Sequence, residues 1–549
     1  MMTAAANIAS TLVEMAQRQP NVDALLTNPR RDAQRKLSYT RTTFQQLNDK
    51  SDRLARGLAA VGIATGTRTA LCLRPGVDFF ATTFALFKLG AIPVLIDPGI
   101  GLKNFGRCLA QATPTAFIGI PLAHGLRRLF GWAKQSIRIN ISTGGFGGIS
   151  LSEIESRGGA CGRLPDTGDQ ANAAAILFTS GSTGPAKGVL YTHDNFLAQI
   201  DALKHTYDIQ PGEIDLATFP LFALFGPALG MTTVLPDMDF TRPGFVDPQN
   251  IIDPIQQLGI TNMFGSPALI DCVSRYGAEH NITLPSLQRV ISAGAPASPR
   301  VLERFSQMLA PATQIFTPYG ATEALPVSSI GSHDILGSTR KLTDSGKGVC
   351  IGRPVDNIRV RIIKIIDVAI AAWSDDLELP PNEIGEIVVQ GPVVTSEYFD
   401  RPDATGLAKI ADASNGCFYH RMGDVGYLDS DGRLWFCGRK SQRVRLPERD
   451  LFSTPFEAVF NTHPSVGRSA LVGIKRGGIV CPVICIEPTQ ENTTPPSTFA
   501  QELFSLAQRY EHTRVIREFL FHPRFPVDIR HNAKINREKL TLWAQRKLA

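Results

Sequence analysis

Apolar residues recur with two different periods along the first hundred residues. Residues 43–60 show the spacing of an amphipathic helix. The apolar positions in this stretch are Phe44, Leu47, Leu54, Ala55 and Leu58. Short apolar runs at 69–73 and 92–96 are typical of buried strands, and residues 77–89 between them predict a helix that ends at Gly90. This strand–helix–strand order predicts a βαβ unit in a mainly parallel sheet.

The pattern changes twice farther along the chain. Strands and helices alternate to about residue 340, which favours an α/β fold. From 383 to 437, short strands alternate with glycine turns, and Asp431-Gly432 is a strong hairpin signal. After Arg439, a helix–strand–strand–helix pattern fills the remaining residues. Because 549 residues are too many for one ordinary core, we predict at least two domains.

Composition and charge exclude several classes of protein. Hydrophobic residues make up 43% and charged residues 19%, as in a soluble globular protein. The net charge of +6 has no polybasic block, so we predict no nucleic-acid partner. No apolar run of about 18 residues occurs, and no basic region precedes the early Glu14, so neither a membrane span nor a signal peptide is predicted. Nine scattered cysteines without a C-x-x-C pair favour a reducing compartment, and we expect the cytoplasm.

The most informative segment is 176–189, ILFTSGSTGPAKGV. An apolar run of strand type ends at Phe178 and leads into a loop rich in glycine and hydroxyl groups. Glycines let backbone N–H groups approach an anion, hydroxyls add donors and a lysine adds charge, so the loop suits a polyphosphate. It does not match a Walker A loop. A flexible linker is the alternative interpretation, but linkers do not follow a buried strand and end in Lys-Gly. The candidate phosphate ligands are Thr179, Ser180, Gly181, Ser182, Thr183, Gly184 and Lys187.

This loop resembles the signature of the adenylate-forming superfamily, which includes acyl-CoA synthetases, peptide-synthetase adenylation domains and luciferases. The resemblance continues in order over nearly the whole chain. Similar segments lie at 78–98, 289–305, 317–326, 423–440 and 530–540. The resemblance implies a large N-terminal α/β domain with parallel sheets at 1–438, a hinge at 439–441 and a small mobile α+β lid at 442–549.

The resemblance also implies a nucleotide site. The purine loop is identified with Gly294, Ala295 and Pro296. Tyr319, followed by Gly320, stacks on adenine, and an aromatic face suits a purine. Thr322 meets the α-phosphate and Glu323 holds Mg²⁺, whose usual shell is a carboxylate with phosphate oxygens. ATP and Mg²⁺ are therefore the implied nucleotide and metal.

Three residues nearer the C-terminus complete the implied site. Asp424 binds both ribose hydroxyls, and Arg439 reaches the nucleotide beside the hinge. Lys534 contacts the substrate carboxylate and the α-phosphate. Attack of a carboxylate on the α-phosphorus needs charge neutralisation on both anions, which Mg²⁺ and two lysines provide. The implied catalytic residues are Lys534, Thr322 and Glu323, and the implied reaction is formation of an acyl-adenylate with release of pyrophosphate.

The sequence departs from the superfamily at three places. Relatives that make thioesters carry a glycine-containing loop past the hinge, whereas this chain has no glycine between Gly438 and Gly467 and has Pro447 in the loop. Ser441 stands where the hinge usually has Asp or Lys, and Ala223 stands where many relatives have His beside the acyl pocket. Ordinary drift is one interpretation. The other is that the enzyme does not use CoA.

Several segments are more similar to one subgroup, the bacterial olefin-pathway β-lactone synthetases. They are residues 96–121, 177–191 and 528–540. This resemblance implies a long-chain 2-alkyl-3-hydroxy acid, whose own hydroxyl closes a lactone after activation, and a complex with other enzymes of an olefin pathway. An intramolecular nucleophile needs no second binding site. His193 and His420 are both candidates for a base at the 3-hydroxyl.

Two other functions are compatible with the motifs. An acyl-CoA ligase, or a ligase that loads a carrier protein, uses the same adenylation chemistry. A non-catalytic nucleotide-binding assembly subunit is a different class, but the lysines and carboxylates of the motifs are all present. Residues 121–139 alternate leucine and aromatic residues with basic ones. This pattern is typical of a surface helix with one packed face, and it is also compatible with contact to a membrane surface, an acyl-chain entrance or a partner enzyme.

Overall fold

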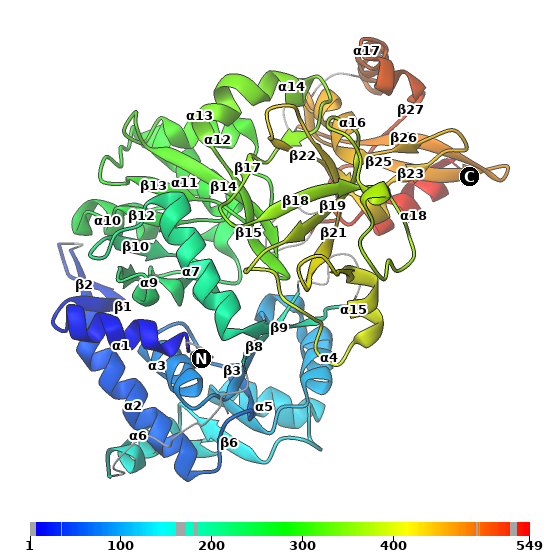
Figure 1. The fold of residues 1–549 in the computed structure, drawn as a ribbon. Coiled ribbons are helices and arrows are strands. Elements are labelled where there is room, and N and C mark those ends of the chain that lie inside the picture. The colour runs from blue at the N-terminus through cyan, green and yellow to red at the C-terminus, as the bar shows by residue number, and fades with distance from the viewer. Residues whose placement is uncertain are drawn as a thin grey trace.

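The computed structural model describes residues 7–34, 36–160, 172–179, 185–489, 492, 495–527 and 535–548. Two mostly parallel sheets with helices on their faces form the larger part of the molecule, and a smaller unit formed by the C-terminal residues lies beside them (Figure 1). This architecture confirms the predicted α/β fold.

In the described residues, the first sheet has seven strands in the order β7-β6-β5-β3-β4-β8-β9, parallel except for the β8–β9 pair. The strands are β3 (Arg68–Cys72), β4 (Ile92–Leu95), β5 (Ala116–Gly119), β6 (Ile139–Ser142), β7 (Ile149–Ser150), β8 (Ala173–Phe178) and β9 (Gly188–Thr192). One face is covered by α2 (Phe44–Ala60), α3 (Val77–Lys88) and α6 (Leu151–Ala160), and the other by α4 (Leu102–Ala112) and α5 (Pro121–Phe130).

The second sheet runs β17-β15-β14-β13-β12-β10-β11-β1-β2 and is parallel from β14 to β1. Its strands are β1 (Asp23–Arg31), β2 (Leu37–Thr43), β10 (Ile214–Ala217), β11 (Thr232–Val234), β12 (Asn262–Phe264), β13 (Arg289–Ile291), β14 (Gln314–Ala321), β15 (Ala324–Gly331) and β17 (Arg353–Pro354). Its outer face carries α10 (Gln249–Leu258), α11 (Pro267–His280) and α12 (Pro299–Ser306).

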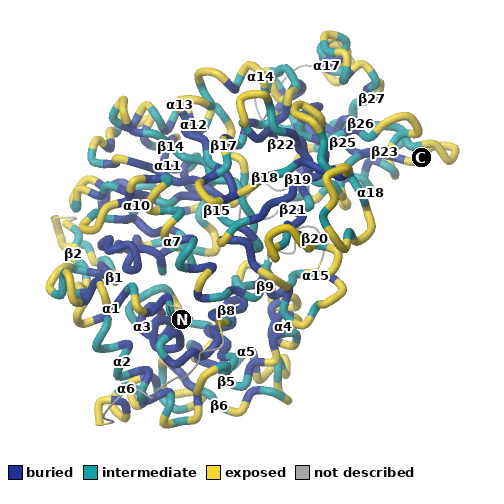
Figure 2. Tube along the Cα trace, in the orientation of Figure 1, coloured by how far each residue is buried: buried dark blue, intermediate teal, exposed yellow. Residues whose placement is uncertain are grey.

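A continuous core joins the two sheets. It contains Leu71 and Leu95 from the first sheet, Leu25 and Ala217 from the second, and residues of the helices between them. These inner helices include α1 (Ala9–Arg18), α2, α3 and α7 (His193–Tyr207). Figure 2 shows the sheet strands mostly buried and the helix surfaces exposed on the outside. The sheets therefore form a rigid base on which the loops at the carboxyl ends of their strands are placed.

A third sheet is antiparallel and leads into the C-terminal unit. It contains β16 (Val349–Cys350), β18 (Arg359–Ile363), β19 (Gly385–Gln390), β20 (Lys409–Asp412), β21 (Cys417–Leu428) and β22 (Leu434–Arg439). The C-terminal unit contains β23 (Val444–Arg445), β24 (Asp450–Leu451), α16 (Ser453–Phe460), β25 (Val466–Arg476), β26 (Ile479–Pro488), α17 (Pro496–Gln508), β27 (Glu518–Phe521) and α18 (Arg537–Leu548). The unit has its own apolar cores, built from residues after 443.

Most predicted elements are confirmed, and two predictions need correction. The helix predicted at 43–60 is α2, which Thr43 and Gln46 cap reciprocally. Gly90 follows α3 with φ +63°, and Gly432 has φ +73° in the β21–β22 hairpin, as expected where a turn needs a left-handed residue. The helix–strand–strand–helix prediction missed β27, which pairs in parallel with β26. The helix within 121–139 ends at Phe130. No helix in the described residues is long and apolar enough to cross a bilayer.

Candidate active site

The predicted phosphate loop connects two antiparallel strands. Strands β8 and β9 pair up to Phe178 and Gly188. The Thr179 N–H donates to the Lys187 carbonyl over 3.0 Å, and the Lys187 N–H donates to Thr179 Oγ1 over 3.1 Å. The chain therefore leaves and re-enters the sheet at one point, as a tight phosphate loop requires. The predicted ligands Ser180, Gly181, Ser182, Thr183 and Gly184 lie outside the described residues.

Lys187 is linked to Glu323 through an unpredicted tyrosine. The Lys187 ammonium lies 4.6 Å from the centre of the Tyr398 ring, a cation–π distance. The Tyr398 hydroxyl donates to Glu323 Oε1 over 2.6 Å. Burial and the nearby Glu323 raise the pKa of Tyr398, so its hydroxyl stays a donor. The predicted phosphate lysine and the predicted metal carboxylate thus lie on either side of one aromatic side chain.

A second polar group is centred on Asp424. The Tyr319 hydroxyl donates to Asp424 Oδ2 over 2.6 Å, and Arg439 approaches Asp424 Oδ1 to 2.9 Å. Asp424 pairs with Arg439 across the β21–β22 register, while Tyr319 comes from β14. Asp424 raises the pKa of Arg439, and burial followed by the Asp424 charge raises the pKa of Tyr319 well above its ordinary value. We call Lys187, Tyr319, Glu323, Tyr398, Asp424 and Arg439 the nucleotide cradle.

Two predicted glycines fit the backbone around the cradle. A Cβ on Gly320 would lie 2.6 Å from the Ala324 carbonyl oxygen, so a side chain cannot be placed there without moving backbone. Gly294 has φ +95° and turns the chain toward Ala295 and Pro296 after β13. The Ser292 N–H donates to the Phe316 carbonyl over 2.8 Å, which fixes this purine loop beside β14.

The Thr322–Glu323 turn is held by backbone contacts. The Tyr191 hydroxyl donates to the Thr322 carbonyl over 2.5 Å, and the Thr395 N–H donates to the Glu323 carbonyl over 3.0 Å. The Lys409 ammonium bonds the Thr395 carbonyl, and burial lowers the pKa of Lys409 to about 7, an effect that Glu323 opposes. The motifs did not identify Tyr398, Thr395 and Lys409. These residues lie outside every motif, and only the fold brings them close to Glu323.

The carboxylate of Glu323 fits a magnesium ion that also binds phosphate. The described residues contain no group of three or more His, Cys, Asp and Glu that suits a metal. Mg²⁺ typically uses one or two carboxylates and takes its remaining ligands from water and substrate phosphates. Glu323 beside the phosphate loop satisfies that requirement, so the residues fit a metal that arrives with the nucleotide.

The two candidate bases differ in their surroundings. His193 begins α7, where its Nδ1 accepts from the Ile8 N–H over 3.4 Å, and burial lowers its pKa to about 4. His420 is buried in β21, and burial together with the charges of Lys409 and Lys187 lowers its pKa well below the ordinary value. Because Lys187 belongs to the cradle, His420 is the candidate that lies near it. The lid lysine Lys534 is outside the described residues.

An apolar cavity of about 60 Å³ adjoins the cradle. Pro318, the neighbour of Tyr319, lines it, as does Ala223 of α8 (Pro220–Ala223). Phe219, Phe222, Leu229 and Phe264 are among the other apolar residues of its wall. Ala223 therefore lies where the sequence placed a residue that shapes the acyl pocket.

The far wall of the cavity contains one polar pair. Asn262 Nδ2 donates to Asp215 Oδ1 over 2.5 Å across the β10–β12 register. Burial raises the pKa of Asp215 to about 7. Asp215 therefore keeps a proton in mildly acidic solution, and the wall stays close to neutral.

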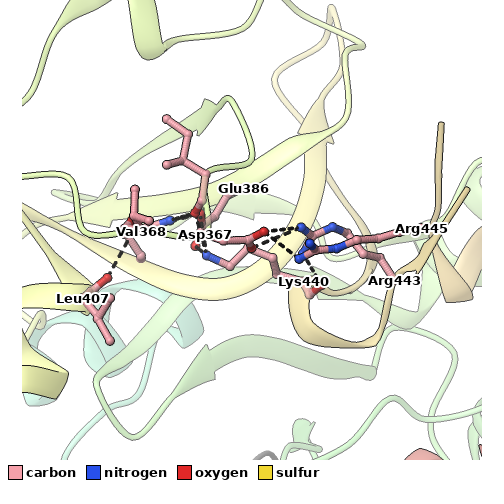
Figure 3. A network of polar contacts seen from close by, with 9 residues as sticks. Asp367, Val368, Glu386, Leu407, Lys440, Arg443 and Arg445 are labelled. Carbon is pink, nitrogen blue, oxygen red and sulfur yellow. Dashed lines mark hydrogen bonds and ion pairs between the residues drawn. The ribbon is translucent and has the colours of Figure 1, made fainter. Parts of the chain in front are cut away.

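A network of ion pairs lies at and just after the predicted hinge (Figure 3). Lys440 contacts both oxygens of buried Glu386, at 2.9 and 3.0 Å. Arg443 contacts both oxygens of Asp367, at 2.8 and 3.1 Å, and Arg445 adds a contact to Asp367 at 2.6 Å. Lys440 of the predicted hinge is therefore anchored to β19, and Arg443 and Arg445 just after it are anchored to the loop that follows β18.

The polar cradle, the phosphate loop and the adjoining apolar cavity define an enzyme that joins a nucleotide to an apolar acid. The chain belongs to the AMP-binding enzyme family, whose model matches residues 12–399. This finding confirms the predicted superfamily and the ATP-dependent, adenylate-forming ligase class.

Two relatives are similar over almost their whole length. The chain is 46% identical to the olefin β-lactone synthetases of Stenotrophomonas maltophilia and Xanthomonas campestris, over 99% of this chain and 98% of each relative. The fold also matches a solved structure of O-succinylbenzoate coenzyme A synthetase from Bacillus subtilis in complex with ATP and magnesium ion. That match has a TM-score of 0.74 and 21% identity and covers 96% of this chain and 99% of the other.

Proposed function

We propose that this chain uses ATP and Mg²⁺ to convert a long-chain 2-alkyl-3-hydroxy acid into a β-lactone, as a step of olefin biosynthesis. A carboxylate oxygen attacks the α-phosphorus and pyrophosphate leaves. The 3-hydroxyl oxygen then attacks the acyl carbon, the bond from that carbon to the AMP oxygen breaks, and the hydroxyl proton passes to a base. Identity of 46% to two olefin β-lactone synthetases over nearly the full chain supports this function.

The observation that carries the proposal is that the cavity and the nucleotide site share chain segments. Pro318 lines the apolar cavity and precedes Tyr319, which bonds Asp424 in the cradle, and Ala293 lines the cavity and precedes Gly294 of the purine loop. We infer that an acid whose chain lies in the cavity has its carboxylate close to a bound nucleotide. Holding two reactants in this way replaces much of the entropy that a bimolecular reaction loses.

We propose the following roles for the predicted site residues. Tyr319, with the loop Gly294, Ala295 and Pro296, faces the purine, and Asp424 with Arg439 faces the ribose. Lys187 and the hydroxyl-rich loop hold the phosphates. Glu323, kept in place by Tyr398, is the ligand for Mg²⁺, which neutralises phosphate charge when bound. Thr322 and Lys534 meet the α-phosphate.

We also propose that residues 1–438 and 442–549 are separate domains joined by a hinge at 439–441. Separate apolar cores after residue 443 support this division. Rotation of the lid would bring Lys534 to the site for adenylation. Past the hinge, Arg443 is tied to Asp367 and Asp450, so the loop has no slack for a pantetheine arm. This supports a reaction without CoA.

Product analysis tests the proposal. ATP, Mg²⁺ and a 2-alkyl-3-hydroxy acid are incubated with the full chain, with and without CoA, and products are identified by mass spectrometry. We expect AMP, pyrophosphate and a product lighter than the acid by one water, in equal amount with and without CoA. An acyl-CoA product would identify an acyl-CoA ligase instead.

A further inference from the structure

The excess of basic over acidic residues in this protein comes from one segment. Residues 98–152 contain no Asp or Glu. Their basic residues are Lys103, Arg107, Arg127, Arg128, Lys134 and Arg138. These six equal the whole formal net charge of +6, so the rest of the chain balances at 50 basic and 50 acidic residues (56 − 6 = 50). With 50 acidic residues in 549, a stretch of 55 residues would contain about five carboxylates on average.

Exposed apolar side chains gather in the same segment. Thirteen large apolar residues are exposed in the described part of the chain, and five of them lie between residues 102 and 146. These five are Leu102, Leu122, Leu129, Phe130 and Phe146, with Leu129 the most exposed at 75%. Single exposed apolar residues are ordinary, but such a cluster marks an interaction surface.

The fold holds these residues on one outer layer. Helices α4 and α5 both cover the same face of the seven-stranded sheet (Figure 1). Trp132 packs between them: its ring lies 5.3 Å from Phe105 of α4 and stacks at 5.3 Å on Phe130 at the end of α5. A Cβ on Gly106 would lie 2.5 Å from the Trp132 ring, so the glycine permits this contact. The layer is thus a packed platform and not a loose loop.

The basic residues divide into one internal and five external ones. Arg127 is buried, bonds Asn140 over 2.7 Å and lies 5.3 Å from the Phe117 ring, so it stabilises the platform. The other five are exposed and make no ion pair with described residues. Arg128 covers the ring of Phe146 at 4.9 Å, which places a guanidinium beside an exposed aromatic side chain.

We propose that this basic platform, residues 98–152, binds an anionic lipid bilayer from one side. Exposed leucine and phenylalanine side chains interleaved with Lys and Arg are the pattern that inserts apolar groups among lipid chains while cations meet the headgroups. A second copy of the chain is a poor occupant, because a two-fold contact would place this acid-free surface on itself. The proposal is independent of the lactone chemistry.

Vesicle sedimentation with the full chain tests the proposal. Vesicles of phosphatidylcholine alone are compared with vesicles that contain about 30% phosphatidylglycerol, a strongly anionic surface. The test variants are L129S/F130S, and R128S/F146S at the cation–π pair. The matched control is R242S/F245S, because Arg242 lies 4.8 Å from the exposed ring of Phe245 in the same type of pair elsewhere on the surface. Melting temperature and adenylation rate confirm that each variant is folded.

The unmodified chain should sediment with anionic vesicles, and added salt should release it. Each test variant should partition about tenfold less. R128S/F146S loses one cation, which contributes about a fivefold effect near an anionic surface, together with one apolar ring, and L129S/F130S loses two apolar side chains that would insert among the lipids. The control should bind normally. Absence of sedimentation of the unmodified chain, or equal losses in test and control variants, would overturn the proposal. Concentration-dependent dimers that L129S/F130S abolishes, without vesicle binding, would identify a second copy as the occupant.

Discussion

The nucleotide cradle and the apolar cavity meet at residues 318 and 319 but are built in opposite ways. In the cradle, charges are buried beside partners: Asp424 lies between Tyr319 and Arg439. In the cavity, Asp215 is the one titratable residue among the described residues of the wall, and burial raises its pKa to about 7. The cradle therefore keeps its charged groups paired, whereas the cavity wall suppresses the charge of its carboxyl group.

The largest expected effect is a loss of ATP use after a substitution in the cradle. Asp424→Asn removes the charge between Tyr319 and Arg439 and leaves Arg439 without its carboxylate. We expect kcat/KM for ATP to fall by about 100- to 1,000-fold, or about 3–4 kcal/mol, since breaking a buried ion pair has this magnitude. The KM for the acid should change little. Steady-state kinetics with each substrate varied in turn measures both.

Asp429→Asn is the matched control for this change. Asp429 directly follows β21 and also bonds an arginine, Arg433, but its second side-chain partner is Trp435 and not a residue of the cradle. Its kinetics with ATP should stay close to those of the unmodified chain. Equal losses for the two variants would show that β21 folding, and not the cradle charge, controls ATP use.

The second effect concerns stability and tests the neutral wall of the cavity. The folded-state pKa of Asp215 is raised to about 7 from an ordinary 3.8. Between these values the folded state keeps a proton that the unfolded state releases, so the free energy of unfolding falls as pH rises through this window. Asp215→Asn cannot ionise and should be more stable than the unmodified chain at pH 8 by about 4 kcal/mol, but not at pH 4.

Thermal unfolding at both pH values measures this difference. The hydrogen bond from Asn262 can persist, because an amide oxygen accepts as a carboxylate does. Asp201→Asn, at an exposed side chain, is the control substitution and should change the melting temperature little. A stability gain for Asp215→Asn that is equal at both pH values would contradict the raised pKa.

A third effect changes the cavity without touching the cradle. Ala223→Leu adds a branched side chain to the wall of a cavity of about 60 Å³. The KM for a long-chain acid should rise about 10- to 30-fold, or about 1.5–2 kcal/mol, while the KM for ATP stays unchanged. Ala228→Leu in α9 (Phe225–Ala228) is buried outside the wall and should lower the melting temperature without this selective effect. Parallel rises in both KM values would refute the separation of the two regions.

The smallest effect lies at the hinge. Asp367→Asn removes the carboxylate that Arg443 and Arg445 share, and Arg443 holds the pKa of Asp367 below its ordinary value. Because 46% of the Asp367 side chain is exposed, the change should alter kcat by less than about fivefold. Asp403→Asn, at an exposed pair with Arg401, should have no effect. Pre-steady-state AMP release distinguishes the two variants.

The cradle could be predicted from sequence more fully than the cavity. Tyr319 and Glu323 lie in one short motif, and Asp424 and Arg439 lie in another, so local sequence identifies them. Asp215 and Asn262 become partners only through the β10–β12 register, across 47 residues. A buried polar pair of this kind has no local pattern, which is why the cavity wall was not predicted.

The same reason explains the remaining omissions. Tyr398 bonds Glu323 from 75 positions away and lies in no periodic segment. Strand β27 has four residues and pairs in parallel with β26, so its apolar pattern was too short to separate from a loop. By contrast, α2 was predicted nearly to its ends from the spacing of its apolar residues alone, and the structure shows that Thr43 and Gln46 cap it.

The most direct test of the central claim compares two acids that differ in one oxygen. A 2-alkyl-3-hydroxy acid and its 3-deoxy analogue are supplied at equal concentration with ATP and Mg²⁺, and AMP release is followed with and without CoA. Both acids should form an adenylate. Only the hydroxy acid should turn over repeatedly, and CoA should accelerate neither, because the nucleophile is the substrate's own hydroxyl. Rapid, CoA-dependent AMP release from the 3-deoxy acid would contradict lactone closure.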